Sequence, residues 1–128
     1  MTKGSKRVLD RVVLHLGDGV RRVVDPADVY YLEAENEDTR VRFRSARATV
    51  DVRTLREVLP HFVPHGFIQI HREYVVNLRR IRQIRKRVGG RDWEVKLEPP
   101  VNRVLPVSRG ALAKLWEAFG EVKGSSGA

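Results

Sequence analysis

Residues 67–81 carry the side chains with the most distinctive chemistry in this sequence. One apolar run ends at His71 and Arg72, and a second ends at Asn77. Seven basic residues follow without a single acidic one, namely Arg79, Arg80, Arg82, Arg85, Lys86, Arg87 and Arg91. A buried segment that presents a polar pair and continues into a cationic strand indicates a negatively charged partner.

Two arginines stand beside local anchors, as a specific contact requires. Arg72 follows His71 and a buried run, and Arg109 follows Ser108, a predicted helix N-cap whose hydroxyl can accept a backbone N–H. The exposed N–H groups and the dipole of a first helical turn favour an anion beside Arg109. Because arginine matches guanine O6/N7 as well as phosphate, both residues suit contact with nucleic acid.

Each candidate also has a structural interpretation. The arginines could form surface ion pairs or cover apolar surface with their stems. For His71 we favour a hydrogen-bonded structural histidine, and for Asn77 a turn-forming or capping residue. The run 79–91 is by default a solvated face. Where it extends a contact surface, it would attract phosphate without distinguishing bases, through Arg79, Arg80 and Arg85.

The composition bounds the class of protein. A chain of 128 residues can form one domain with its own core, and the absence of cysteine excludes disulfides and thiolate metal sites. A formal charge of +9 indicates a polyanionic partner, since neutralised phosphates release counterions, although a merely basic surface is the alternative. No apolar run approaches the ~18 residues that span a bilayer, and no signal-peptide core is present. We therefore expect a cytoplasmic protein without a membrane partner.

Catalytic and metal sites find little support. His61, His65 and His71 lie near one another in sequence, but Pro64 and Gly66 deny them a shared helical face. The sequence has no thiol, no G-x-S-x-G elbow and no phosphate-binding glycine loop. We predict a binding module that is not an enzyme and that uses no metal and no cofactor.

Alternating apolar and polar residues predict a mainly β fold of short antiparallel strands. Gly17-Asp18-Gly19 and Gly89-Gly90 suit tight hairpin turns. Val41 and Phe43 are expected to face the core. The predicted strands are 11–16, 20–24, 29–34, 39–44, 47–50, 67–70, 78–88, 91–97 and 101–107, with one helical turn at 26–28.

Two short helices complete the prediction. Helical spacing of apolar residues, from Val52 to Leu59, predicts a helix over 51–59 that Pro60 ends. A second helix follows Ser108, and Gly120 suits its C′ position. Its apolar stripe comprises Leu112, Leu115, Trp116 and Phe119. Residues 11–120 form the predicted domain, with a flexible lead-in at 1–10 and a flexible tail at 121–128.

Residues 67–81 resemble the F-x-x-x-H-R-x-x-x-V-N-x-x-x-I signature of LytTR DNA-binding domains. Residues 28–34 (DVYYLEA) are similar to the family's D-I-x-Y-I-E-A, and residues 105–109 (LPVSR) to its closing V-S-R. With the helix at 55–59, the resemblance covers residues 12–119. It implies an elongated set of small β-sheets in a bacterial, response-regulator-like transcription regulator. Family members bend DNA by inserting loops into successive major grooves, and usually bind repeated half-sites as dimers or pairs.

The resemblance also implies contact residues. The family's base-contacting loops correspond to Thr39-Arg40, to Arg72 beside His71, and to Arg109 after Ser108. Glu73 stands where the family usually has a small residue, and Thr39 is short, so Arg40 would serve in its place. With the residues above, the candidate DNA-binding set is Thr39, Arg40, His71, Arg72, Asn77, Arg79, Arg80, Arg85, Ser108 and Arg109.

The sequence therefore predicts a sequence-specific domain for double-stranded DNA, acting in transcription regulation. A non-catalytic RNA-binding module or a non-specific polyanion binder is the alternative, and a protein-interaction module with an exposed apolar patch is a third. RNA binding would favour exposed stacking platforms. We expect the aromatic residues instead to lie mostly in the core, namely Tyr30, Tyr31, Phe43, Trp93 and Trp116.

Overall fold

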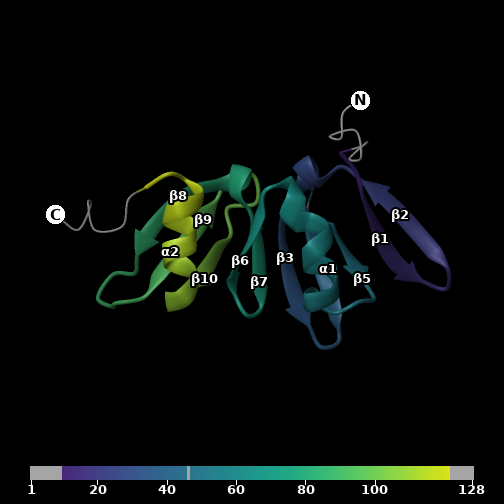
Figure 1. Ribbon diagram of the computed structural model, residues 1–128, viewed down its shortest axis with the longest axis horizontal. Helices are drawn as coiled ribbons and strands as arrows, with labels where there is room; N and C mark the ends of the chain where they lie inside the picture. Colours follow the sequence, from purple (N-terminus) through teal and green to yellow (C-terminus); the bar gives the residue numbers. More distant parts are fainter. Residues whose placement is uncertain (1–9, 46, 122–128) are drawn as a thin grey trace, which may run out of the picture.

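Three antiparallel sheets and two α-helices follow one another along an elongated molecule (Figure 1). The computed structural model describes residues 10–45 and 47–121. The strands are β1 (Val12–Gly17), β2 (Val20–Val24), β3 (Val29–Glu35), β4 (Asp38–Phe43), β5 (Ala48–Asp51), β6 (Phe67–His71), β7 (Tyr74–Asn77), β8 (Ile81–Lys86), β9 (Trp93–Leu97) and β10 (Val104–Val107). The helices are α1 (Leu55–Phe62) and α2 (Arg109–Ala118), with 3-10 turns η2 (Pro26–Asp28), η3 (Val63–His65) and η4 (Leu78–Arg80). The predicted mainly β fold with two short helices is confirmed.

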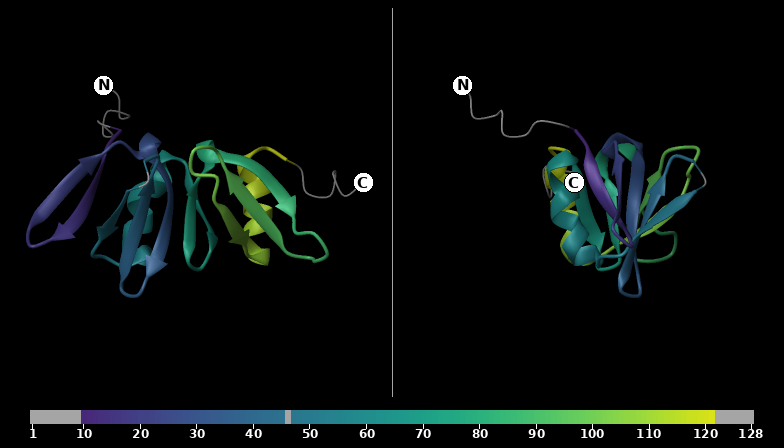
Figure 2. Two further views of the ribbon diagram at one scale, coloured as in Figure 1. Left: turned by 180° about the vertical axis from the view of Figure 1, so that it is seen from behind. Right: turned by 90° about the vertical axis from the view of Figure 1, so that its right-hand side faces the viewer.

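The central sheet has five strands in the order β5-β4-β3-β7-β6 and is buried on both faces. One face packs against α1 and the β1–β2 hairpin around a first core, which includes Leu14, Val58 and Phe62. The other face packs against α2 and the three-stranded sheet β10-β9-β8 around a second core, which includes Val95, Leu105 and Leu115. Figure 2 shows the two helices on the same side of the molecule.

A β-bulge allows β3 to contribute to both cores. The register of β3 against β4 shifts between Val29 and Tyr31, so that one extra residue is accommodated. Val29 and Leu32 consequently face the first core, while the consecutive Tyr30 and Tyr31 both face the second. This explains why four adjacent residues of β3 are buried without the usual alternation.

Aromatic residues join the three-stranded sheet to the central sheet and to α2. Arg103 Nη1 donates to the Tyr31 hydroxyl at 2.6 Å, and its guanidinium lies 5.4 Å from the Tyr31 ring centroid. Trp93 of β9 and Trp116 of α2 meet edge to face at 5.6 Å. Tyr30 and Tyr31 are buried and Phe43, Trp93 and Trp116 are half-buried, so the predicted core location of the aromatic residues is confirmed.

The first predicted helix was misplaced by four residues. The helix begins at Leu55 because Thr54 caps it: the Thr54 side chain accepts from Glu57 N–H, and Glu57 returns a bond to Thr54 N–H. Pro60 lies inside the helix instead of ending it, close to the C-terminus where its missing N–H removes a single backbone bond. Asp51 belongs to β5, and Val52 is exposed outside the helix.

Three other predicted boundaries are corrected. Residues 78–80 form η4 before β8 begins, because the Asn77 side chain accepts from Arg79 N–H and turns the chain. The strand predicted over 101–107 is regular only from Val104 onward. Phe119 is the C-cap of α2 and is 49% exposed, so it does not continue the apolar stripe.

The C-terminal end of α2 has Gly120 at the predicted C′ position, whereas its N-terminal end lacks the predicted side-chain hydrogen bond of Ser108. Gly120 adopts a φ of 75°, and the N–H groups of Gly120 and Glu121 donate to Glu117 O and Trp116 O. Ser108 is the N-cap residue, but its side chain makes no capping hydrogen bond. Of the predicted flexible ends, residues 1–9 and 122–128 lie outside the described residues.

Candidate nucleic-acid interface

Three segments that carry predicted contact residues meet along one edge of the molecule, which we call the turn edge. It comprises the β3–β4 turn, the β6–β7 turn and the N-terminal end of α2, at the bottom of Figure 1. Two backbone hydrogen bonds join the segments: Ala34 N–H donates to Glu73 O at 2.9 Å, and Ser108 N–H donates to Ile70 O at 2.8 Å. Arg72 and Arg109 lie on these segments and Arg40 lies in β4 next to the first of them; all three are exposed.

The β6–β7 turn presents Arg72 from a backbone that is fixed on both sides. The register of β6 shifts between Gln69 and His71, and Ile70 is buried in the second core. His71 Nδ1 accepts from Glu73 N–H at 3.1 Å, which closes the turn around Arg72. The structural interpretation of His71 is thus confirmed, and the ring positions the turn. Glu73 is exposed beside Arg72 and adds a negative charge there.

The N-terminal end of α2 lies against the same turn. Ser108 and Arg109 are exposed, and Arg72, Ser108 and Lys114 line one shallow cavity of about 350 Å³. Ser108 O accepts from Ala111 N–H and Leu112 N–H, so the first helical turn is formed although the hydroxyl does not cap it. Backbone N–H groups and the two cationic side chains of Arg72 and Lys114 therefore surround this hollow, an arrangement that suits an anion.

Thr39 lies in the interior, not on the turn edge. It is fully buried, and its hydroxyl donates to Arg53 O at 2.9 Å. The predicted contact role of Thr39 is corrected on this ground, since a buried hydroxyl with a backbone partner is not presented to a ligand. The neighbouring Arg40 is exposed, as the alternative in the sequence analysis required.

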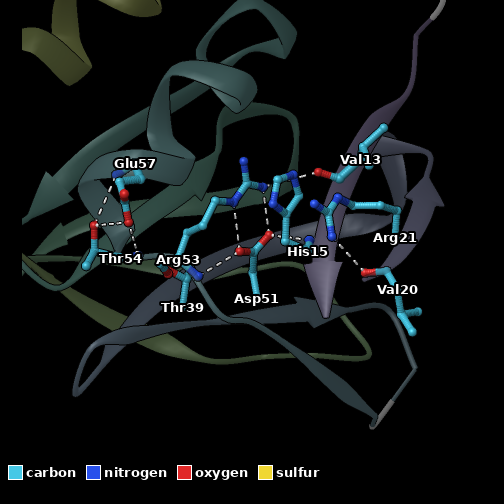
Figure 3. Close-up of polar contacts among 9 residues, drawn as sticks. All are labelled: Val13, His15, Val20, Arg21, Thr39, Asp51, Arg53, Thr54 and Glu57. Carbon is cyan, nitrogen blue, oxygen red and sulfur yellow. Dashed lines mark hydrogen bonds and ion pairs between the residues drawn. The ribbon is translucent and has the colours of Figure 1, made fainter. Parts of the chain in front are cut away.

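A buried ion pair, which we call the Asp51 clasp, holds this part of the edge to the hairpin (Figure 3). Asp51 is fully buried and accepts from Arg53 N–H, Nε and Nη2 at 2.8–3.0 Å and from His15 N–H at 2.9 Å. Arg53 Nη2 also donates to Val13 O at 3.2 Å. The clasp thus joins β1, β5 and the start of α1, and Thr39 attaches β4 to it.

Opposing effects act on the pKa of Asp51. Burial raises it, but the hydrogen bonds from Arg53 and from the His15 backbone prevail and hold the pKa below the ordinary value for aspartate. For the His15 imidazole, burial and the charges of Arg53 and Arg21 lower the pKa. The sequence does not reveal the clasp, because the apolar spacing from Val52 to Leu59 places Asp51 and Arg53 at the start of a predicted helix.

Asn77, Arg79 and Arg80 lie at the opposite ends of the strands from the turn edge, because β7 runs from the turn edge to η4 (Figure 1). Asn77 is 1% exposed, and its Nδ2 donates to Val29 O at 2.9 Å. Its predicted place at a DNA surface is corrected accordingly, and its capping role is confirmed. Arg80 donates to Ala27 O at 2.7 Å and stacks on Tyr30, whereas Arg79 is exposed.

The β8–β9 hairpin extends the basic surface beyond α2. Arg85 is paired with Glu94 at 2.8 Å, and Arg87 lies 3.6 Å from the same carboxylate. Arg91 has no carboxylate within ion-pair distance among the described residues, and it lines a cavity with His71, Ser108 and Arg109. Arg91 was noted in the sequence only as part of the basic run, since nothing in the pattern shows that the hairpin turn folds toward α2.

Neither a metal cluster nor a membrane span is found in the part of the chain that the structure covers. No group of three or more His, Asp or Glu side chains there could hold a metal ion. Neither α1 nor α2 is long and apolar enough to cross a bilayer.

Comparison with known proteins gives matches over most of the chain. A family model described as the LytTr DNA-binding domain matches residues 20–120. The CO-responsive transcriptional regulator RcoM of Rhodospirillum rubrum is 30% identical over 107 residues, which are 84% of this chain and 44% of that protein. The sensory transduction protein LytT of Oceanobacillus iheyensis is 26% identical over 117 residues, 91% of this chain and 47% of that protein.

A solved structure shows the same fold. A LytTr DNA-binding domain from Bacillus cereus superposes with a TM-score of 0.68 at 21% identity, covering 88% of this chain and 98% of that one. The chain spans about half the length of the curated relatives that it matches.

Proposed function

Since this chain belongs to the LytTr DNA-binding domain family, we propose that it binds double-stranded DNA in a sequence-specific manner through the turn edge. Loop residues of this edge enter the major groove, and the domain acts in a bacterial transcription regulator. Two relatives named as a transcriptional regulator and a sensory transduction protein support the regulatory role.

The single observation that carries the proposal is the pair of backbone hydrogen bonds that unite the turn edge. Ala34 N–H to Glu73 O and Ser108 N–H to Ile70 O hold three loops from distant parts of the chain in one row. Side chains on rigidly placed loops lose less conformational freedom on binding, which favours specific contact. A merely basic surface would not need such connections.

The ten candidates divide into four groups under this proposal. Arg72 and Arg109 contact base edges, with Arg40 as the contact from the β3–β4 turn. His71 and Ser108 position the two arginines, and Thr39 and Asn77 support the fold from the interior. The other three supply charge only, with Arg79 and Arg80 remote from the duplex and Arg85 weakened by Glu94.

Charge is unevenly spread along the turn edge. Glu35 and Glu37 are exposed in the β3–β4 turn, whereas Arg72, Arg91, Arg109 and Lys114 surround the end near α2. Carboxylates repel phosphates, so we assign backbone contact mainly to the α2 end. Near the β3–β4 turn, Arg40 approaches the duplex beside the carboxylates of Glu35 and Glu37. Their repulsion of phosphates disfavours every placement of the duplex except the one in which Arg40 makes its contact.

The assembly on DNA is part of the same proposal. We expect two copies of the domain to occupy repeated half-sites, as dimers or paired monomers, as the family resemblance implies. Half-sites about one helical turn apart, ~10 bp, would place both copies on the same face of the duplex.

Selection of random duplex DNA on the purified chain at near-physiological salt tests the function directly. An enriched motif, repeated at about 10-bp spacing, is the expected result. Salt-sensitive retention without any motif would replace the proposal by non-specific polyanion binding. Preference for single-stranded RNA would indicate the RNA-binding alternative, which the buried tyrosines of β3 do not favour because they offer no stacking platform.

A further inference from the structure

A second basic hollow lies at the opposite ends of the strands from the turn edge. Three arginines from two separate segments line it: Arg22 of β2, and Arg44 and Arg47 from the connection between β4 and β5. Thr49, Ser45 and Phe43 complete the lining, and Asp28 contributes the single acidic side chain. The cavity measures about 510 Å³.

Arg22 is held in place at this hollow. Its Nη1 donates to Thr49 Oγ1 at 3.0 Å, and its guanidinium carbon lies 5.5 Å from the Phe43 ring centroid. Stacking and one hydrogen bond fix the guanidinium plane while leaving other N–H donors free, as bidentate recognition of a phosphate requires. Arg44 is anchored by its backbone, since Arg44 N–H donates to Asp28 O at 3.1 Å.

The charges of this hollow are not balanced within the described residues. Arg11, Arg53, Arg80, Arg85 and Arg87 each lie within 4.0 Å of a carboxylate. Arg22, Arg44 and Arg47 have no such partner there, and Asp28 is too distant from each of them to form an ion pair. Like charges gathered around one cavity repel one another, and an anion between them would relieve that repulsion.

The DNA proposed for the turn edge does not reach this hollow. Strand β4 connects the two ends, from Thr39 to Arg44, and five residues of strand span ~17 Å. A duplex seated on the β3–β4 turn therefore lies ~17 Å from the hollow along β4. The hollow needs another ligand.

We propose that Arg22, Arg44 and Arg47 form a phosphate-binding site separate from the DNA-binding edge. Its ligand is a phosphate group, carried by a small phosphorylated molecule or by the backbone of a second duplex. Thr49 and Ser45 offer hydroxyl groups to the same ligand. The site is independent of the function proposed for the turn edge.

Titration of the full chain with inorganic pyrophosphate, followed through the arginine Nε resonances by NMR, tests the site. Saturable shifts of Arg22, Arg44 and Arg47 are expected. The double variant Arg44→Gln/Arg47→Gln should weaken pyrophosphate binding at least tenfold. These side chains are exposed, so the variant should keep the fold, which the dispersion of the backbone spectrum checks.

A matched control removes the same charge elsewhere. Arg79→Gln/Arg82→Gln changes two exposed arginines outside the hollow and should alter pyrophosphate affinity less than twofold. Equal weakening by both double variants, shifts centred on Arg72 and Arg109, or no saturation would each overturn the proposal.

A bridging experiment then identifies the source of the phosphate. One duplex is immobilised, the protein is added, and capture of a second labelled duplex is measured. Bridging that Arg44→Gln/Arg47→Gln abolishes would identify a second duplex as the ligand. Pyrophosphate binding without bridging would identify a small phosphorylated molecule. The selection of random duplex DNA, which tests the turn edge, can be measured in either case. Failure of this site and failure of DNA binding are therefore distinguishable.

Discussion

At the scale of single residues, the same side-chain type has several roles. Arg53 is an internal partner of Asp51, Arg80 covers Tyr30, and Arg72 is exposed on a fixed turn. Charge and spacing in the sequence do not reveal which guanidinium groups already have a partner inside the protein. Arg72 and Arg109 could be predicted from their neighbours, since His71 and Ser108 mark the ends of buried segments.

Replacing Arg72 or Arg109 with alanine should reduce both affinity and discrimination. Loss of a bidentate base contact costs ~1–3 kcal/mol on the selected site and much less on random DNA. Fluorescence anisotropy titrations on both kinds of duplex measure the difference. Arg82→Ala, an exposed arginine on β8, serves as the control. Equal losses on selected and random DNA would remove both residues from base readout.

The Asp51 clasp should appear as a large stability effect. Asp51→Asn removes one charge from a buried pair and leaves Arg53 with a neutral partner, so we expect a loss of about 3 kcal/mol in the free energy of unfolding. Urea denaturation measures it. Asp92→Asn, at an exposed position, should change stability by under ~0.5 kcal/mol. Similar small effects for both variants would show that the clasp contributes little.

The Asp51–Arg53 pair should also make the stability of the protein depend on pH, in a direction that follows from the lowered pKa of Asp51. The folded-state pKa of Asp51 is lowered, so the unfolded chain takes up a proton first as the pH falls. The stabilisation is present above the ordinary aspartate pKa, near 4, and declines as the pH falls through the folded-state value. The free energies of unfolding of wild type and Asp51→Asn, measured by denaturation between pH 6 and 2.5, should therefore converge as the pH falls. A gap that stays constant over this range would contradict the assignment.

At the scale of elements, turns and caps decide where the chemistry is placed. Alternation with a tight turn was enough to predict β4 and the β1–β2 hairpin, while β-branched and aromatic content predicted β3 and a short apolar run predicted β6. These patterns did not reveal the bulges in β3 and β6, since a bulge depends on what packs on each face. The helix predicted from residue 51 begins instead at Leu55. The Thr54–Glu57 capping box fixes this start, although the apolar spacing begins at Val52.

The Asn77→Ala variant should test whether Asn77 stabilises the fold or contacts DNA. The substitution leaves Val29 O and Arg79 N–H without their side-chain partners in a buried position, at a cost of ~1–3 kcal/mol in stability. DNA affinity of the folded protein should stay within twofold of wild type, measured well below the melting temperature. A loss of affinity confined to the selected sequence would instead indicate that Asn77 contacts DNA.

At the scale of the whole molecule, the position of a charge matters more than the total of +9. The turn edge and its opposite both carry arginines, but only one edge can face a given duplex. Sequence analysis could predict a basic DNA-binding domain from the charge and the motifs. The sequence does not show that Arg79 and Arg80 lie on the opposite edge from Arg72, because that requires knowing that β7 runs across the sheet between them.

The salt dependence of binding should distinguish the two edges. Arg91→Gln should weaken binding to all sequences alike and lower the slope of log K against log salt by about 1. Arg79→Gln removes the same charge from the opposite edge and should leave the slope unchanged. Arg85→Gln should have a smaller effect than Arg91→Gln, since Glu94 already neutralises Arg85. Equal slopes for all three variants would show that DNA does not prefer the turn edge.

The bulge in β3 also constrains how the length of this domain can vary. Val29 and Leu32 face the first core while Tyr30 and Tyr31 both face the second only because one residue is inserted at that point. A deletion or insertion within these four positions would exchange the faces of the strand and point each of these side chains at the wrong core. Homologues should therefore tolerate substitutions in β3 but confine their insertions and deletions to the turns, above all to the β4–β5 and β8–β9 connections.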